Sequence, residues 1–142
     1  MKMKVLLLSG LFLLLIATSV SAGQMAEVNK STENKGIRLT IKEVGLESGR
    51  LNIEYAIKSD TNYNLKEKEI LLETPDLFIN GNHLNSSMYE SYNQIAKNKY
   101  MGLVTIDFPK NISSEKFNFK FNTDKILNKE GQWTISALIK TK

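Results

Sequence analysis

His83 is the side chain of this sequence best suited to proton transfer near neutral pH, because the chain has a single histidine and no cysteine. A Cys–His pair is therefore impossible, and a zinc site would lack the nitrogen and sulfur ligands that it needs. No Gly-x-Ser-x-Gly motif is present to expose a nucleophilic serine. His83 follows the dipeptide Asn80-Gly81, which favours a tight hairpin, so we expect an exposed turn residue rather than a general base.

Four carboxylates could in principle form the acid–base pair of a glycosidase, namely Glu67, Glu69, Glu73 and Asp76. Lysines alternate with the first two of them, which is typical of a solvated strand face. Asp-rich calcium loops, phosphate-binding glycine loops and dinucleotide fingerprints are absent from the sequence. The sequence therefore predicts no enzyme, no metal site and no cofactor, with a hydrolase that uses these acids as a minor alternative.

Residues 86–100 have the composition of a recognition loop, with tyrosines among serine, asparagine and glutamine. Tyrosine offers a large amphipathic contact area at a low cost in side-chain entropy. Binding residues also concentrate on loops that a rigid scaffold positions. The alternative is a long polar connection between two strands. The candidate binding residues are Tyr89, Tyr92, Asn93, Gln94 and Tyr100.

Alternation of apolar and polar residues with a period of two predicts about seven short strands and no helix of ordinary length. The Phe117, Phe119 and Phe121 row and Trp133 should face the core, and residues 123–129 should form one helical turn. The fold class is therefore all-β. We expect an antiparallel immunoglobulin-like sandwich, with an up-and-down barrel as the alternative.

The amino terminus has the three parts of a secretory signal. Lys2 and Lys4 precede an apolar stretch over residues 5–17, and small residues follow up to Ala22. We predict a signal peptide over residues 1–22, a flexible polar leader over 23–35 and one domain over 36–142. A transmembrane helix needs about 20 apolar residues, so an uncleaved anchor remains the alternative.

The charge and composition of the chain limit the kinds of partner that it can be expected to bind. The full chain carries 19 basic and 15 acidic residues, and removal of Lys2 and Lys4 would leave 17 minus 15, a net charge of +2. These charges are interleaved rather than gathered into the concentrated basic face that nucleic-acid binding needs. Abundant lysine, asparagine and isoleucine are typical of an AT-rich bacterial gene, and we expect no glycosylation at the Asn-x-Ser/Thr matches.

Four segments resemble a bacterial domain family of unknown function: residues 36–44, 50–60, 76–81 and 131–133. That family forms the immunoglobulin-like extracytoplasmic part of anti-sigma-factor-like membrane proteins of Gram-positive bacteria. The resemblance implies an immunoglobulin-like sandwich and an extracytoplasmic location, and it implies no catalytic residue. Only Met1 to Lys4 precede the apolar stretch, so we expect no segment that binds a sigma factor.

The sequence thus predicts a secreted, non-enzymatic domain, associated with the cell envelope or released, that binds a protein or an envelope component. The alternative is a membrane-anchored sensory or structural accessory domain, held by an uncleaved amino-terminal helix. Membrane contact is expected only in that alternative, and nucleic acid is not an expected partner.

Overall fold

The computed structural model describes residues 24–62, 71–73 and 75–141, so the predicted signal segment lies outside the described residues. Strands occupy most of the described chain, and they form two antiparallel sheets. The strands are β1 (Gln24–Asn34), β2 (Ile37–Glu47), β3 (Arg50–Ser59), β4 (Asp76–Ile79), β5 (Asn82–His83), β6 (Met88–Ala96), β7 (Lys99–Asp107), β8 (Lys116–Ile126) and β9 (Lys129–Lys140).

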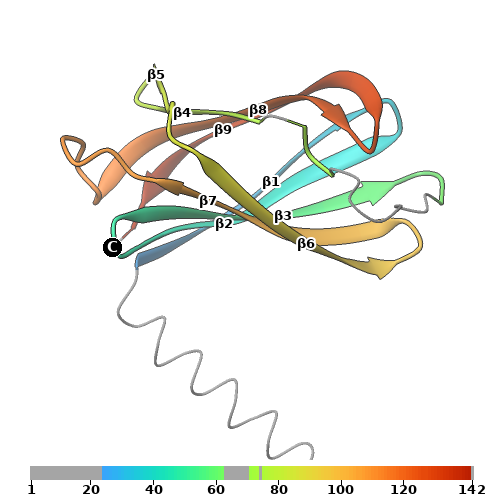
Figure 1. Cartoon of the computed structure of the whole chain (residues 1–142), viewed down its shortest axis with the longest axis horizontal. Coiled ribbons are helices and arrows are strands. Elements are labelled where there is room, and N and C mark those ends of the chain that lie inside the picture. Colours follow the sequence, from blue (N-terminus) through green and yellow to red (C-terminus); the bar gives the residue numbers. More distant parts are fainter. Residues whose placement is uncertain (1–23, 63–70, 74, 142) are drawn as a thin grey trace, which may run out of the picture.

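The two sheets lie one above the other and form a β-sandwich (Figure 1). The five-stranded sheet has the order β1-β2-β3-β7-β6, and the four-stranded sheet has the order β5-β4-β8-β9. The chain passes from one sheet to the other between β3 and β4, between β5 and β6, and between β7 and β8. The prediction of an all-β sandwich is thus confirmed, and the arrangement differs from the alternative of one closed barrel.

Four hairpins close through two-residue turns in which both residues have positive φ angles. This geometry matches the right-handed twist of the flanking strands, and it favours glycine and asparagine. The turn predicted at Asn80-Gly81 is confirmed, with φ angles of 51° and 81°. The other three turns are Lys35-Gly36, Ser48-Gly49 and Leu127-Asn128.

The core lies between the sheets, where the alternating apolar residues of each strand point inward. Phe117, Phe119 and Phe121 are buried, as the sequence predicts. Trp133 is also fully buried, and its Nε1 donates a hydrogen bond of 2.9 Å to the carbonyl of Ile37. This bond satisfies the buried indole N–H and joins β9 of one sheet to the start of β2 in the other.

The prediction of a flexible leader over residues 23–35 is wrong, because β1 begins at Gln24 and pairs with β2 along its length. The register shifts between Glu27 and Lys30, so the strand contains a bulge. Its apolar side chains are few and only half-buried, which is why no clear alternation appears in the sequence. The pairing shows that the folded domain starts about a dozen residues before the predicted boundary at residue 36.

Two further expectations need correction. The described residues contain nine strands rather than about seven, because β1, β5 and β6 were missed. Residues 123–129 form no helical turn, since they belong to the β8–β9 hairpin. Backbone pairing across that hairpin satisfies the N–H and C=O groups that a helical turn would otherwise use.

Candidate functional site

The predicted recognition loop is a β-hairpin, because residues 88–96 form β6 and residues 99–107 form β7. β6 pairs antiparallel with β7 and lies at the edge of the five-stranded sheet. Serine, asparagine and tyrosine are compatible with an edge strand, where one side of the backbone faces solvent. The candidate binding residues are therefore held by a sheet rather than by a loop.

The strand geometry divides these candidates between two faces. Tyr89 and Asn93 point to the outer face and are exposed, whereas Tyr92 and Gln94 lie on the face that continues the core side. Tyr100 is fully buried among the core residues of β7. Its assignment to a binding surface is therefore wrong, because this amphipathic side chain alternates inward with Val104 and Ile106.

The β6–β7 hairpin carries three large exposed apolar side chains, two on its outer face and one, Ile95, at a bulge between Gln94 and Ala96. Tyr89 is 66% exposed, Ile95 is 56% exposed and Leu103 is 39% exposed. Ser91 pairs with Leu103 and Tyr89 pairs with Thr105, so Tyr89 and Leu103 are diagonal neighbours on this face. We call the β6–β7 surface the set of outward residues Tyr89, Ser91, Asn93, Met101 and Leu103, together with Ile95 at the bulge.

Beneath this surface, Glu90 fixes the edge strand to the core. The fully buried Tyr55 hydroxyl donates a hydrogen bond of 2.6 Å to the Glu90 carboxylate. The Tyr55 ring crosses over Gly102 of the intervening strand, and a Cβ atom at position 102 would overlap that ring. Burial raises the pKa of Glu90, and burial next to this carboxylate also raises the pKa of Tyr55.

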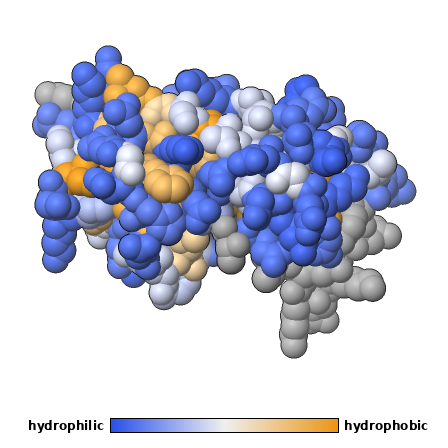
Figure 2. Space-filling model, turned by 90° about the horizontal axis from the view of Figure 1, so that it is seen from above, coloured by the Kyte–Doolittle hydropathy of each residue, from blue (hydrophilic) through white to orange (hydrophobic). Residues whose placement is uncertain are grey.

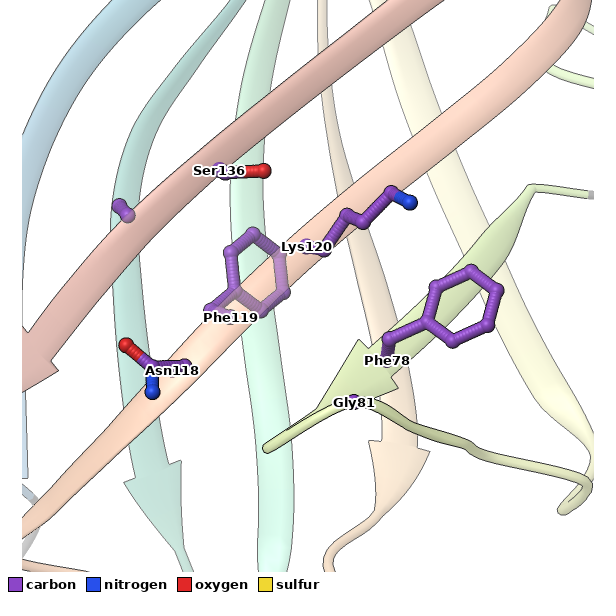
Figure 3. Close-up of a pocket in the computed structure, with 7 residues that line it drawn as sticks. Phe78, Gly81, Asn118, Phe119, Lys120 and Ser136 are labelled. Atoms are coloured by element: carbon purple, nitrogen blue, oxygen red, sulfur yellow. The ribbon is translucent and has the colours of Figure 1, made fainter.

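A second surface lies on the outer face of the four-stranded sheet, on the opposite side of the sandwich. A cavity of about 510 Å³ opens there beside the β4–β5 turn, and Figure 3 shows the residues that line it. The same side of the molecule exposes an apolar area surrounded by polar residues (Figure 2). The lining residues are Phe78, Gly81, Asn118, Phe119, Lys120, Ser136 and Ala137.

One row of side chains crosses this face from strand to strand. His83 pairs with Phe78, Phe78 pairs with Lys120, and Lys120 pairs with Ser136. The Lys120 ammonium lies 5.1 Å from the centre of the Phe78 ring, and the His83 ring meets the same phenyl ring edge-on. This cation–π contact holds the ammonium at the rim of the cavity.

His83 itself is an exposed strand residue that binds its neighbours. Its Nε2 lies 3.0 Å from a carboxylate oxygen of Asp76, and its Nδ1 lies 2.7 Å from the side-chain oxygen of Asn85. The hydrogen bond with Asp76, followed by that with Asn85, raises the pKa of His83. The prediction of an exposed hairpin residue agrees with this position in β5.

The acidic candidates are only partly described. Glu67 and Glu69 lie outside the described residues. Glu73 forms an ion pair of 3.3 Å with Lys125, while Asp76 binds His83. Within residues 24–62, 71–73 and 75–141, no three histidine, cysteine or acidic side chains cluster closely enough to hold a metal ion.

The described part of the chain also contains no helix that is long and apolar enough to cross a membrane.

Sequence reasoning identified Tyr89 but missed Ile95 and Leu103 of the β6–β7 surface, and it also missed the cavity. Leu103 lies in β7, which carries apolar residues on both of its sides, and Met101 lies on the same outward side as Leu103. Apolar residues on both sides of a strand are a signal that was present in the sequence, although β7 lies between β3 and the edge strand β6. The cavity had no such signal, because Phe78, Asn118 and Ser136 meet only through the pairing of distant strands.

The comparisons with known proteins give a fold relative and no function. No family model matches the sequence, and no curated protein matches it. Among solved structures, the chain is similar to one described as "The crystal structure of the conserved domain protein from Bacillus anthracis". The TM-score is 0.64 at 25% sequence identity, over 82% of this chain and 42% of that chain. The chain therefore spans less than half of that protein, and the likeness supports the sandwich fold.

Proposed function

We propose that this chain is an exported, non-enzymatic binding domain that engages a protein partner through the β6–β7 surface. The observation that carries the proposal is the exposure of Tyr89 and Leu103 as neighbours on the outward face of the β6–β7 hairpin, with Ile95 exposed at the bulge of the same edge strand. Only five large apolar side chains of the described residues are exposed, and three of them belong to this surface. Contiguous exposed apolar area of this kind marks interaction sites.

The composition of the β6–β7 surface also supports a protein partner. Tyr89 offers an aromatic ring with a hydroxyl at its tip, which suits the buried centre of an interface. Ser91 and Asn93 lie beside it on the same strand and offer short hydrogen-bonding groups. Strands hold these side chains on a fixed scaffold, so little conformational entropy is lost on binding.

The proposal of a non-enzymatic role rests on the contacts that the titratable side chains make. His83 is hydrogen-bonded to Asp76 on an open sheet face, and Glu73 is paired with Lys125. Glu90, whose pKa is raised by burial, accepts a hydrogen bond from the buried Tyr55 hydroxyl and so serves packing. Glu73 lines a cavity together with Asp124 and Glu130, but its carboxylate is already paired with Lys125, and neither His83 nor Glu90 lines that cavity.

The finer description of the fold belongs to the same proposal. We infer an immunoglobulin-like sandwich, as the family resemblance implies. The chain crosses from one sheet to the other three times, after β3, after β5 and after β7. The extracytoplasmic location rests on the charged, apolar and small-residue segments of residues 1–22. An exported domain without cysteines must be stabilised by packing, and the continuous core between the two sheets fits that demand.

Site-specific photo-crosslinking in producing cells tests the protein partner. A benzoyl-phenylalanine at position 91 lies in the middle of the β6–β7 surface, and the same residue at position 134 lies on the opposite face as a matched control. We expect a discrete protein adduct from position 91 and none of the same mass from position 134. Equal adducts from both positions, or none from position 91, would count against the proposed surface.

Substitutions in the crosslinking chain make the test specific. Tyr89→Ala and Leu103→Asn each remove exposed apolar area, so each should reduce the adduct about tenfold. Both residues are exposed, so the circular dichroism spectrum and the unfolding midpoint should stay close to those of the parent chain. Adduct yields that do not change would show that the crosslinked protein uses another surface.

A further inference from the structure

The cavity on the four-stranded sheet brings three polar side chains to an open site. Asn118 and Lys120 extend outward from β8, and Ser136 extends outward from the paired position of β9. Within the described part of the chain, the Asn118 amide, the Ser136 hydroxyl and the Lys120 ammonium have no hydrogen bond or ion pair. Binding cavities combine an apolar lining with a few such polar groups, and a volume of about 510 Å³ is typical of them.

The charge of this face favours an anion. The outward positions of β8 from Lys116 to Asn122 and of β9 from Thr134 to Lys140 contain three lysines and no acidic residue. Lys116 and Lys140 face each other directly in the register. This pair lies outside the cavity lining, so it adds to the positive charge of the face without being part of the site itself. The nearest acid in the row, Asp76, is bound to His83.

The apolar part of the cavity favours a ring with hydroxyl groups rather than a simple ion. Phe78 and the turn at Gly81 form one wall, and the β8–β9 backbone at Phe119 and Ala137 contributes to the lining. An aromatic wall can pack against the C–H face of a sugar, while an amide and a hydroxyl can bind its hydroxyl groups. Lys120, held against the Phe78 ring, is placed to bind a carboxylate or a phosphate.

We propose that this cavity binds an acidic sugar, with its anionic group on Lys120, its hydroxyls on Asn118 and Ser136, and its ring against Phe78. The site lies on the side of the sandwich opposite the β6–β7 surface, so the inference does not depend on the protein partner. A domain with both surfaces would connect a protein to an acidic glycan.

Titration of the isotope-labelled chain, followed by amide NMR shifts, tests the site. The probes are glucuronate, glucose 6-phosphate, glucose and inorganic phosphate, all at the same low ionic strength. We expect saturable shifts at Asn118, Lys120 and Ser136 with at least one acidic sugar, which should bind about tenfold more tightly than glucose because of one charge-assisted hydrogen bond. The two acidic probes show whether the site prefers a carboxylate or a phosphate.

Two matched lysine variants make the result decisive. Lys120→Gln should abolish the preference for the acidic sugar over glucose, whereas Lys140→Gln, on the same face but outside the cavity lining, should leave it unchanged. The inference is overturned if no probe gives saturable shifts in the cavity. It is also overturned if both variants lose the same affinity, or if inorganic phosphate binds as tightly as glucose 6-phosphate.

Discussion

Glu90 is exposed as a residue, but its carboxylate lies against the buried Tyr55 hydroxyl, and the desolvation of that group makes the stability of the domain depend on pH. Burial raises its pKa in the folded state above the ordinary value of 4.5, although hydrogen bonds from Tyr55 and Leu72 act in the opposite direction. A carboxyl group whose pKa is higher in the folded state than in the unfolded state stabilises the fold while it is protonated. This contribution is complete at a pH below the pKa of the unfolded state, and it is lost as the pH rises through the pKa of the folded state. The ionised form of Glu90 therefore destabilises the fold at neutral pH.

We predict that Glu90→Gln flattens this part of the pH dependence. The free energy of unfolding of the parent chain, relative to that of the variant, should fall as the pH rises from about 4 to 7. Urea unfolding across that range measures it. The exposed Glu47→Gln variant is the control and should keep the pH dependence of the parent chain. A constant difference between the parent chain and Glu90→Gln would contradict the burial of this carboxylate.

Gly102 and Tyr55 form a second coupled pair at the residue scale. The Tyr55 ring occupies the space that a side chain at position 102 would need. We predict that Gly102→Ala lowers the free energy of unfolding by about 2 kcal/mol, because overpacking in a core has that magnitude. In a Tyr55→Leu background the same substitution should cost about 1 kcal/mol less, as expected for residues in contact. Strictly additive effects in urea unfolding would show that the two residues do not compete for space.

At the scale of elements, the strands that the sequence predicts best are those with one fully buried face. β8 and β9 alternate strictly between buried and exposed residues over most of their length, so hydrophobic periodicity identifies them. β1 and β6 are edge strands whose inward side chains are only half-covered, and they can therefore be polar. Their strand character comes from backbone pairing with β2 and β7, which composition does not reveal.

The candidate sites likewise divide into what the sequence pattern predicts and what depends on strand pairing. The tyrosines within residues 86–100 are the basis of the predicted recognition surface. Tyr89 is the most exposed of them, whereas the alternation of β7 buries Tyr100 in the core. The cavity beside Phe78 was beyond sequence reasoning, because it depends on the pairing of β4 with β8. Contacts between residues some 40 positions apart require the sheet order, and a single sequence does not supply it.

β1 provides a direct test at this scale, because it pairs with β2 and packs beside β9. The Lys30 ammonium donates a hydrogen bond of 2.9 Å to the carbonyl of Ser136 across the two sheets. A chain that starts at Gly36 loses these contacts and exposes the edge of β2, so we predict a loss of about 3 kcal/mol or more in the free energy of unfolding. The control is a chain that starts at Gln24. Equal unfolding midpoints would show that residues 24–35 act as a leader after all.

At the scale of the whole molecule, the sandwich presents two different outer faces. The β6–β7 surface is apolar with short polar groups, whereas the outward positions of β8 and β9 combine lysines with amides and hydroxyls. The two sheets share one core between these faces. Both proposed partners, a protein and an acidic glycan, would be met outside the cytoplasm, and export is therefore the claim on which the other proposals depend.

Fractionation of producing cells, with the intact mass of the protein measured in the medium, wall, membrane and cytoplasm, tests export most directly. We predict a species that begins at Gly23 in the medium or wall, because Val20 and Ala22 fit the small-residue rule for signal cleavage. An intact chain that begins at Met1 in the membrane would contradict cleavage and favour the anchored alternative. An intact chain confined to the cytoplasm would contradict the proposed function itself.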